Sequence, residues 1–133
     1  MKRVSGDSLY FLALVNPKDR FHRQAVDFAR AWQGIIVTSR WVLAEICDWL
    51  SSSDNRALAL GVVSQITTSK RFHVIHRSDE LFERGLELYR LRPDQDWSLT
   101  DSVSFIVMAD EGLADALTGD RHFNQAGFTA LLV

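Results

Sequence analysis

The feature of this sequence that most constrains its fold is the alternation of short apolar runs with longer segments of helical periodicity. A short apolar run suits a buried strand, and apolar positions spaced three and four apart suit one face of a helix. When the two alternate along a chain, the strands pair in parallel and the helices cover the sheet. The sequence therefore predicts an α/β domain with a mainly parallel sheet. The expected strands are Gly34–Val37, Phe72–Ile75, Ala114–Thr118 and Thr129–Val133, and the expected helices are Leu9–Val15, Arg20–Gln33, Arg40–Leu50, Asn55–Ser69, Ser78–Arg90 and Leu99–Gly112.

The segment Lys2–Gly6 is the least strand-like of the expected strands. It contains one large apolar residue, Val4, whereas a parallel strand buried on both faces is normally a continuous apolar run. Gly6 weakens it further, because glycine has no side chain to pack. We expect a weak first strand here, with Asp7 directly after it.

Length and composition indicate one domain covering residues 1–133. A chain of 133 residues buries enough apolar surface to fold without disulfides or a structural metal cluster. The single cysteine, Cys47, cannot form an internal disulfide, which favours a reducing cytoplasm. The balance of 15 basic and 17 acidic residues argues against a large basic surface for nucleic acid, although it allows a brief catalytic contact.

No segment of the sequence has the pattern of a membrane span or a secretion signal. The apolar run Leu9–Val15 is too short to cross a bilayer. Asn16-Pro-Lys-Asp-Arg20 follows it where a signal peptide would have small residues. We therefore expect neither export nor membrane insertion.

Four acidic residues stand out by their place relative to the expected elements, and three of them lie where a strand or helix begins or ends. Asp7 follows the first strand and Asp120 follows Ala114–Thr118, which puts both at the carboxyl edge of the sheet, where ligands bind. Both also suit helix N-caps, because aspartate is a preferred capping residue. Asp101 lies three residues after Ser98, a spacing typical of a capping box.

The fourth acidic residue, Glu45, lies on an apolar helix face. Val42, Ile46 and Trp49 form a stripe on the expected helix Arg40–Leu50, and Glu45 falls between them. A carboxylate on a core-facing stripe is costly unless it is paired or bound to a metal. A buried salt bridge to an arginine and a metal site are the two interpretations.

The four acids together suggest a metal site. If Asp7, Glu45, Asp101 and Asp120 converge at one edge of the sheet, their mutual repulsion raises their pKa values or requires a cation. Oxygen ligands suit Mg²⁺ or Mn²⁺. Such an ion lowers the pKa of a bound water and orients it for attack on a phosphodiester. Spacing along the chain does not decide between this site and separate helix caps.

The four acidic motifs resemble those of PIN-domain ribonucleases, and more closely those of the toxin half of VapBC-type toxin–antitoxin pairs. The order and spacing of the motifs, over nearly the whole chain, form a fairly specific signature. The first motif departs from the family pattern, because Val4-Ser-Gly6 precedes Asp7 in place of an apolar strand. The matching segments are Asp7-Ser8 with the loop Ala13–His22, then Thr38–Glu45, Trp97–Ser102 and Thr118–Phe123.

The resemblance implies a PIN-like (Rossmann-like) three-layer sandwich with a mainly parallel sheet of about five strands. It implies one or two Mg²⁺ or Mn²⁺ ions held by Asp7, Glu45, Asp101 and Asp120, with Ser8 donating a hydrogen bond inside the pocket. The implied reaction is endonucleolytic cleavage of RNA by metal-activated water, leaving 5′-phosphate and 3′-hydroxyl ends. A homodimer and a small antitoxin that inserts an arginine or lysine among the carboxylates are also implied.

The main alternative is a non-catalytic PIN-like module that binds RNA or protein after losing its metal. A dinucleotide-binding domain and a P-loop enzyme are excluded, because neither glycine-rich motif occurs in the sequence.

Other polar and aromatic residues beside the motifs have a functional and a structural interpretation. Lys18, Arg20, Arg40 and Arg121 are candidate contacts to RNA phosphates or simply solvated surface charges. The tryptophans are expected in the core, with Trp97, beside Asp101, the best candidate for stacking on a base. His122 is expected either at the polar surface or supporting the acidic ligands from outside. The tryptophans are Trp32, Trp41, Trp49 and Trp97.

Overall fold

The computed structural model describes residues 2–133, and Met1 of the expected domain lies outside the described residues. Helices and strands alternate as the sequence predicts. In chain order they are β1 (Arg3–Gly6), α1 (Ser8–Val15), α2 (His22–Ala31), β2 (Ile35–Ser39), α3 (Arg40–Trp49), α4 (Arg56–Thr68), β3 (Phe72–Ile75), α5 (Ser78–Leu91), α6 (Leu99–Glu111), β4 (Asp115–Leu117), α7 (Arg121–Gln125) and β5 (Thr129–Ala130).

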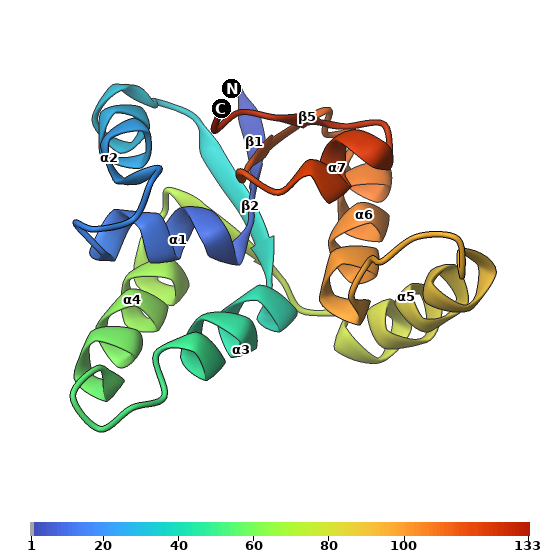
Figure 1. Ribbon diagram of the computed structural model, residues 1–133, viewed down its shortest axis with the longest axis horizontal. Helices are drawn as coiled ribbons and strands as arrows, with labels where there is room; N and C mark the ends of the chain where they lie inside the picture. The colour runs from blue at the N-terminus through green and yellow to red at the C-terminus, as the bar shows by residue number, and fades with distance from the viewer. Residues whose placement is uncertain (1) are drawn as a thin grey trace.

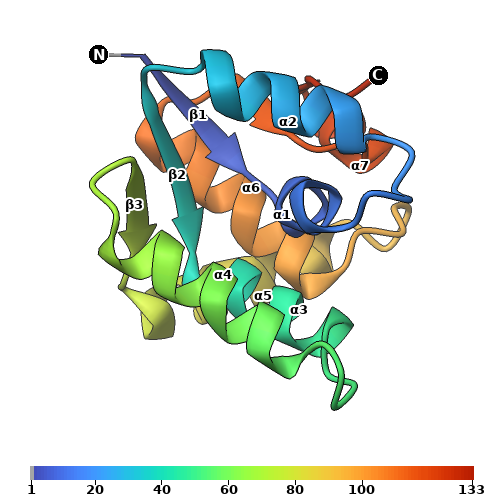
Figure 2. The same cartoon turned by 90° about the vertical axis from the view of Figure 1, so that its left-hand side faces the viewer.

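The five strands form one parallel sheet in the order β3-β2-β1-β4-β5. Val4 of β1 lies opposite Ile36 of β2, and Gly6 lies opposite Leu117 of β4. The arrows of β1, β2 and β3 run the same way in Figure 2. The predicted α/β class with a parallel sheet is confirmed.

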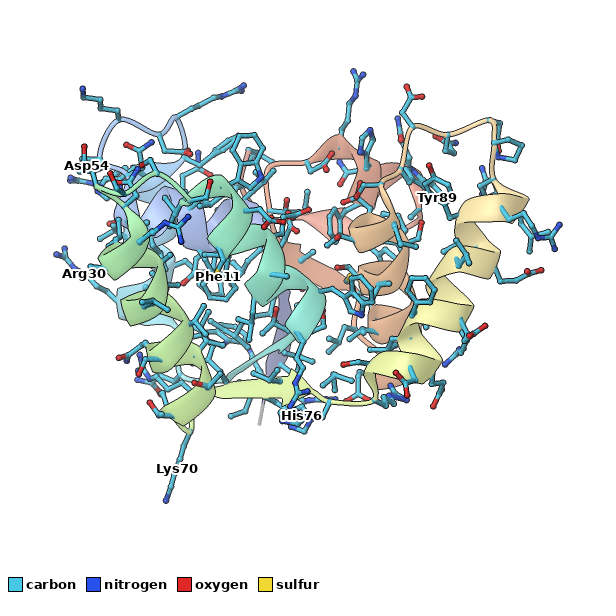
Figure 3. All side chains as sticks on the ribbon, turned by 90° about the horizontal axis from the view of Figure 1, so that it is seen from below. Phe11, Arg30, Asp54, Lys70, His76 and Tyr89 are labelled. Carbon is cyan, nitrogen blue, oxygen red and sulfur yellow. The ribbon has the colours of Figure 1, made fainter. Side chains whose placement is uncertain are left out.

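Helices cover both faces of the sheet, which gives the predicted three layers (Figure 1). Neighbouring strand residues face opposite cores: Ile36 packs with α1, α2, α3 and α4, while Val37 packs with α5, α6 and α7. In Figure 3, Phe11 of α1 lies among the enclosed side chains, whereas Lys70 extends outward. The sheet is therefore buried on both faces, as parallel sheets require.

The strand expected to be weak, β1, is the central strand of the sheet. Val4, Ser5 and Gly6 are all buried, so small residues here reflect crowding. A Cβ atom on Gly6 would lie 2.7 Å from Ile36 Cγ2 and 3.1 Å from the Phe11 ring. Thr38 Oγ1 also donates a hydrogen bond of 3.0 Å to the Gly6 carbonyl. Close packing, not a lost strand, explains the departure from an apolar lead-in.

Three details differ from the sequence expectations. The last strand is assigned over Thr129–Ala130 only, although the Leu131 and Leu132 amides still donate to β4 and Thr118 carbonyls. The short helix α7 was not among the predicted helices, although the capping interpretation of Asp120 implied a helix start there. Trp49, predicted in the core, is 69% exposed, whereas the next residue, Leu50, packs against the core.

Among residues 2–133, the structure contains no helix with the length and apolar character of a bilayer span.

Candidate active site

The four acidic residues singled out in the sequence lie around the carboxyl end of the central strand. Asp7 directly follows β1, and Asp120 follows the neighbouring β4. Asp101 lies in the first turn of α6, and Glu45 lies in the middle of α3, which follows β2. The chain reverses strand order at β1, since β2 and β3 continue to one side of it and β4 and β5 to the other. Crevices for ligands form at such a switch point.

Asp7 occupies the cap position of α1 but does not cap the helix with its side chain. Its Oδ2 accepts a hydrogen bond of 2.7 Å from Thr118 Oγ1, and only 4% of the residue is exposed. Burial raises the pKa of Asp7 to about 7, the Thr118 hydrogen bond opposes the rise, and the charges of Glu45 and Asp101 add to it. This carboxylate is thus held in place without a compensating cation from the described chain.

Glu45 extends from α3 toward the same place. The Ser8 hydroxyl donates a hydrogen bond to Glu45 Oε1. Partial burial raises the pKa of Glu45, and the nearby charges of Asp101 and Asp120 raise it further. The buried salt bridge to an arginine considered from the sequence is absent from residues 2–133, where no arginine or lysine pairs with Glu45.

Asp101 both caps a helix and faces the other acids. The Asp101 amide donates to Ser98 Oγ at 3.0 Å, and Asp101 Oδ2 accepts from the Ser98 amide at 3.1 Å, which completes the predicted capping box. Burial raises the pKa of Asp101, and the charge of Asp120 adds to this effect. The cap orients the carboxylate and does not remove it from the pocket.

Asp120 caps the short helix α7 and brings a histidine to the acids. Its Oδ1 accepts a hydrogen bond of 2.9 Å from the His122 amide. The imidazole Nδ1 of His122 lies 3.3 Å from Asp101 Oδ2 and 3.3 Å from Asp120 Oδ1. One potential ligand atom from each of these three residues lies within 4.8 Å of the others.

The charges of neighbouring acids in this set help to raise the pKa values of Asp7, Glu45 and Asp101. Asp7 senses Glu45 and Asp101, while Glu45 senses Asp101 and Asp120. Several other acids pair with arginines, for example Asp110 with Arg84 at 2.5 Å and Glu111 with Arg3 at 2.7 Å.

A cluster of carboxylates without a lysine or arginine partner among residues 2–133, here called the acidic pocket, suits a hard divalent cation. The ligand atoms that lie within 4.8 Å of one another come from Asp101, Asp120 and His122, and these two carboxylates and one imidazole fit Mg²⁺ or Mn²⁺.

Sequence reasoning did not single out Thr118, which connects two of the acids. Its hydroxyl donates to Asp7 and accepts a hydrogen bond of 3.1 Å from the Asp120 amide. The signal was present in Thr118-Gly-Asp120, because a hydroxyl two residues before an aspartate can accept from that aspartate's amide.

The basic residues proposed as RNA contacts are all exposed. Within the described chain none of them forms an ion pair, so their charges stay available to an anion. The Arg20 guanidinium lies 4.9 Å from the centre of the Phe21 ring. Arg40 begins α3, the helix that carries Glu45. Arg121 begins α7, directly after Asp120. These four residues are Lys18, Arg20, Arg40 and Arg121.

The remaining tryptophans support structure. Trp97 is buried, donates a hydrogen bond of 3.2 Å from Nε1 to Gln125 Oε1, and packs edge-on against Phe105. Trp32 stacks on Phe28.

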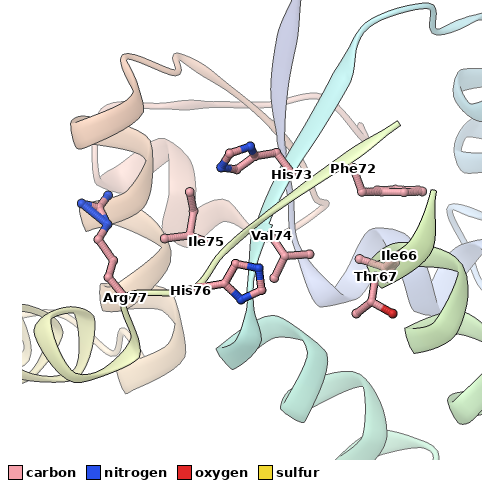
Figure 4. Close-up of a pocket in the computed structure, with 8 residues that line it drawn as sticks. All are labelled: Ile66, Thr67, Phe72, His73, Val74, Ile75, His76 and Arg77. Carbon is pink, nitrogen blue, oxygen red and sulfur yellow. The ribbon is translucent and has the colours of Figure 1, made fainter. Parts of the chain in front are cut away.

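A separate hollow of about 480 Å³ lies along the edge strand β3 (Figure 4). His73 and His76 point to different sides of this segment in Figure 4, so they do not converge on a common ligand. No carboxylate or cysteine is among the described residues that line it, which makes it a poor metal site.

We compared the sequence and the structure with those of known proteins. No protein-family model matches the chain. It is 28% identical to the 23S rRNA-specific endonuclease VapC20 of Mycobacterium tuberculosis, strains CDC 1551 / Oshkosh and H37Rv, over 123 residues that make up 92% of this chain and 92% of VapC20. The crystal structure of VapC20, a Sarcin-Ricin loop cleaving toxin, superposes with a TM-score of 0.88 and 26% identity, covering 96% of this chain and 98% of that one. The chain has a VapC-type PIN fold.

The resemblance to VapC-type PIN proteins inferred from the four motifs is thereby confirmed. Two further structures share the PIN fold at lower identity. VapBC2 of Rickettsia felis, bound to a DNA fragment from its promoter, gives a TM-score of 0.67 and 14% identity over 97% of both chains. FitAcB of Neisseria gonorrhoeae gives a TM-score of 0.63 and 11% identity over 96% of this chain and 94% of that one.

Proposed function

We propose that this PIN protein is a metal-dependent endoribonuclease and the toxin of a type II toxin–antitoxin pair. The observation that carries the proposal is the buried carboxylate of Asp7, whose pKa is raised by the charges of Glu45 and Asp101 and which has no lysine or arginine partner in the described chain. A cation is the group that such a pocket needs. The similarity to VapC20, an rRNA endonuclease, supports RNA as the substrate.

In this proposal the chain's own residues hold and orient the acids. Asp7, Glu45, Asp101 and Asp120 bind the ion, which when present lowers the pKa of a water and offsets charge developing on the phosphate. Thr118 orients Asp7 and Ser8 orients Glu45. Because the pKa of Asp7 is about 7 without metal, ion binding at neutral pH displaces a proton from this carboxyl in part of the molecules.

The exposed cations complete the binding surface for RNA. Arg40 and Arg121 begin helices that carry or follow acids of the pocket, and Lys18 and Arg20 lie in the loop between α1 and α2. They offset the negative potential that the pocket presents to a polyanion. Substitution of one of them by alanine lowers RNA affinity and makes it less dependent on salt.

Partners and location follow from the toxin assignment. A nuclease active on cellular RNA needs restraint, and an antitoxin arginine or lysine placed among the carboxylates offsets their charge as the metal does. We propose such an antitoxin, a homodimeric toxin and a cytoplasmic location. Co-purification from native cells tests the partner. Recovery without any small protein, together with harmless overexpression, contradicts it.

The alternative of a non-catalytic module rested on the weak first motif. In the structure β1 is the central strand, and Asp7 accepts a hydrogen bond from Thr118, whose hydroxyl also accepts from the Asp120 amide, so this reason for the alternative no longer holds.

The decisive experiment is an RNA cleavage assay with Mg²⁺, Mn²⁺ or EDTA. The substrates are intact ribosomes, total RNA and an oligonucleotide of the 23S rRNA sarcin–ricin loop, the last chosen from the VapC20 similarity. We expect metal-dependent cuts with 5′-phosphate ends, lost in Asp7→Asn and Asp101→Asn and kept in Asp115→Asn, an exposed aspartate outside the pocket. Intact RNA in every condition at micromolar protein, with no binding of either metal by calorimetry, refutes the proposal.

A further inference from the structure

The segment Thr118–Phe123 positions the imidazole of His122, and the same segment positions Asp7 and Asp120. Asp120 caps α7 by accepting from the His122 amide, which fixes the backbone next to the carboxylate. The following residue, Phe123, is fully buried and anchors the short helix in the second core. His122 is thus held at the pocket by a capped backbone on one side and a buried neighbour on the other.

The distances around Nδ1 match those between ligands of one metal ion. Nδ1 lies 3.3 Å from an oxygen of Asp101 and 3.3 Å from an oxygen of Asp120. Adjacent ligands of an octahedral ion with bonds of about 2.1 Å lie about 3 Å apart, and opposite ligands about 4.2 Å apart. All three donor atoms lie within 4.8 Å of one another, so a small adjustment places an ion between them.

The contact between Nδ1 and Asp101 Oδ2 is also a hydrogen bond, but a long one at 3.3 Å. An N–H donor normally lies about 2.9–3.0 Å from one preferred acceptor. Here the nitrogen is equally far from two carboxylates and at the long end of the range for both. Nδ1 and the two carboxylate oxygens can therefore serve as three ligands of one cation.

We propose that His122 Nδ1 is itself a metal ligand, together with Asp101 and Asp120. This inference rests on the metal site of the proposed function, and it replaces the all-oxygen donor set expected from the sequence with a mixed nitrogen and oxygen set. Imidazole favours transition metals, whereas Mg²⁺ prefers carboxylate and water oxygens. The site therefore discriminates in favour of Mn²⁺ over Mg²⁺, and His122 is the residue responsible.

The test is pulsed EPR of the full chain loaded with Mn²⁺, which detects hyperfine coupling from a directly bound imidazole nitrogen. We expect this coupling in the wild type and in His76→Asn, an exposed histidine away from the pocket, and its loss in His122→Asn and His122→Ala. Calorimetry should show Mn²⁺ affinity falling about tenfold or more in His122→Ala, while Mg²⁺ affinity falls less.

The outcomes separate this inference from the proposed function. Mn²⁺ bound to the wild type without nitrogen coupling overturns the role of His122 and leaves the nuclease proposal standing. Failure to bind Mn²⁺ overturns the role of His122, and failure to bind either Mn²⁺ or Mg²⁺, together with intact RNA, overturns both. If the His122 variants do not fold, as judged by circular dichroism in EDTA, the triple variant of His22, His73 and His76 to Asn retains His122 as its one histidine. Coupling in that protein supports the proposal, and its absence refutes it.

Discussion

Replacing Asp7 by asparagine is expected to stabilise the metal-free protein while abolishing its metal site. Burial and neighbouring carboxylates raise the pKa of Asp7 from 3.8 to about 7. One pKa unit corresponds to about 1.4 kcal/mol, so ionised Asp7 lowers the free energy of unfolding by up to about 4 kcal/mol. Asparagine keeps the shape and an oxygen that can accept from Thr118, but carries no charge.

The size of the stability change depends on pH. The folded protein binds a proton at Asp7 more tightly than the unfolded chain does, so this group's contribution becomes less favourable as pH rises from about 4 to about 7. The advantage of Asp7→Asn is therefore at most about 4 kcal/mol at pH 8 and below about 1 kcal/mol at pH 4.

Urea unfolding in EDTA, followed by tryptophan fluorescence at both pH values, measures this difference. The matched control is Asp115→Asn, an exposed aspartate whose replacement should change stability by less than about 0.5 kcal/mol at either pH. Equal stability of Asp7→Asn and wild type at pH 8, or a stabilisation that does not depend on pH, would show that Asp7 is not a strained buried carboxylate.

Three other predictions concern packing, orientation and ligation. Gly6→Ala should lower the free energy of unfolding by about 1–3 kcal/mol, because its Cβ would meet Ile36 Cγ2 at 2.7 Å. Gly61→Ala, on open helix surface, should be neutral or stabilising. Equal shifts in the melting temperature of the two variants would contradict this prediction. Thr118→Val should weaken Mn²⁺ binding measured by calorimetry by about 10–100-fold, because Asp7 loses its orienting donor; unchanged affinity argues against that role. Mn²⁺ at 100 times its Kd should stabilise the wild type by about 2.7 kcal/mol relative to EDTA in urea unfolding, and Asp101→Asn should lose this gain.

The fold could be predicted well from local patterns, because burial on both faces of a parallel sheet requires short apolar strands between amphipathic helices. Phe72–Ile75 is a strand with the expected bounds, and most other elements differ by one or two residues at their ends. The errors arise where packing overrides the pattern. Trp49 continues an apolar stripe yet lies in solvent, and Leu50 is the residue that packs on the core at this end of α3.

For the candidate site too, local patterns predicted one part and tertiary packing decided the rest. Residue types and order alone singled out Asp7, Glu45, Asp101 and Asp120, because carboxylates at strand ends or on an apolar helix face are unusual enough to notice. The capping interpretation was also correct for Asp101 and Asp120: Asp101 Oδ2 accepts from the amide of the N-cap residue Ser98, and Asp120 Oδ1 accepts from the His122 amide. Local sequence cannot separate these two roles, since one carboxylate has oxygens for both.

Only the tertiary structure decided which groups surround those carboxylates. Thr118 is 111 residues from Asp7 in the chain, and His122 is 21 residues from Asp101. Their polar atoms nevertheless lie 2.7 Å apart in the first pair and 3.3 Å apart in the second, because β4 pairs with β1 and α7 follows β4. The small residues before Asp7 had the same origin, since Gly6 fits between Ile36 and Phe11 where a larger side chain does not. Local propensity acts over a few residues, whereas the charge, hydration and donor set of a pocket depend on segments joined only by folding.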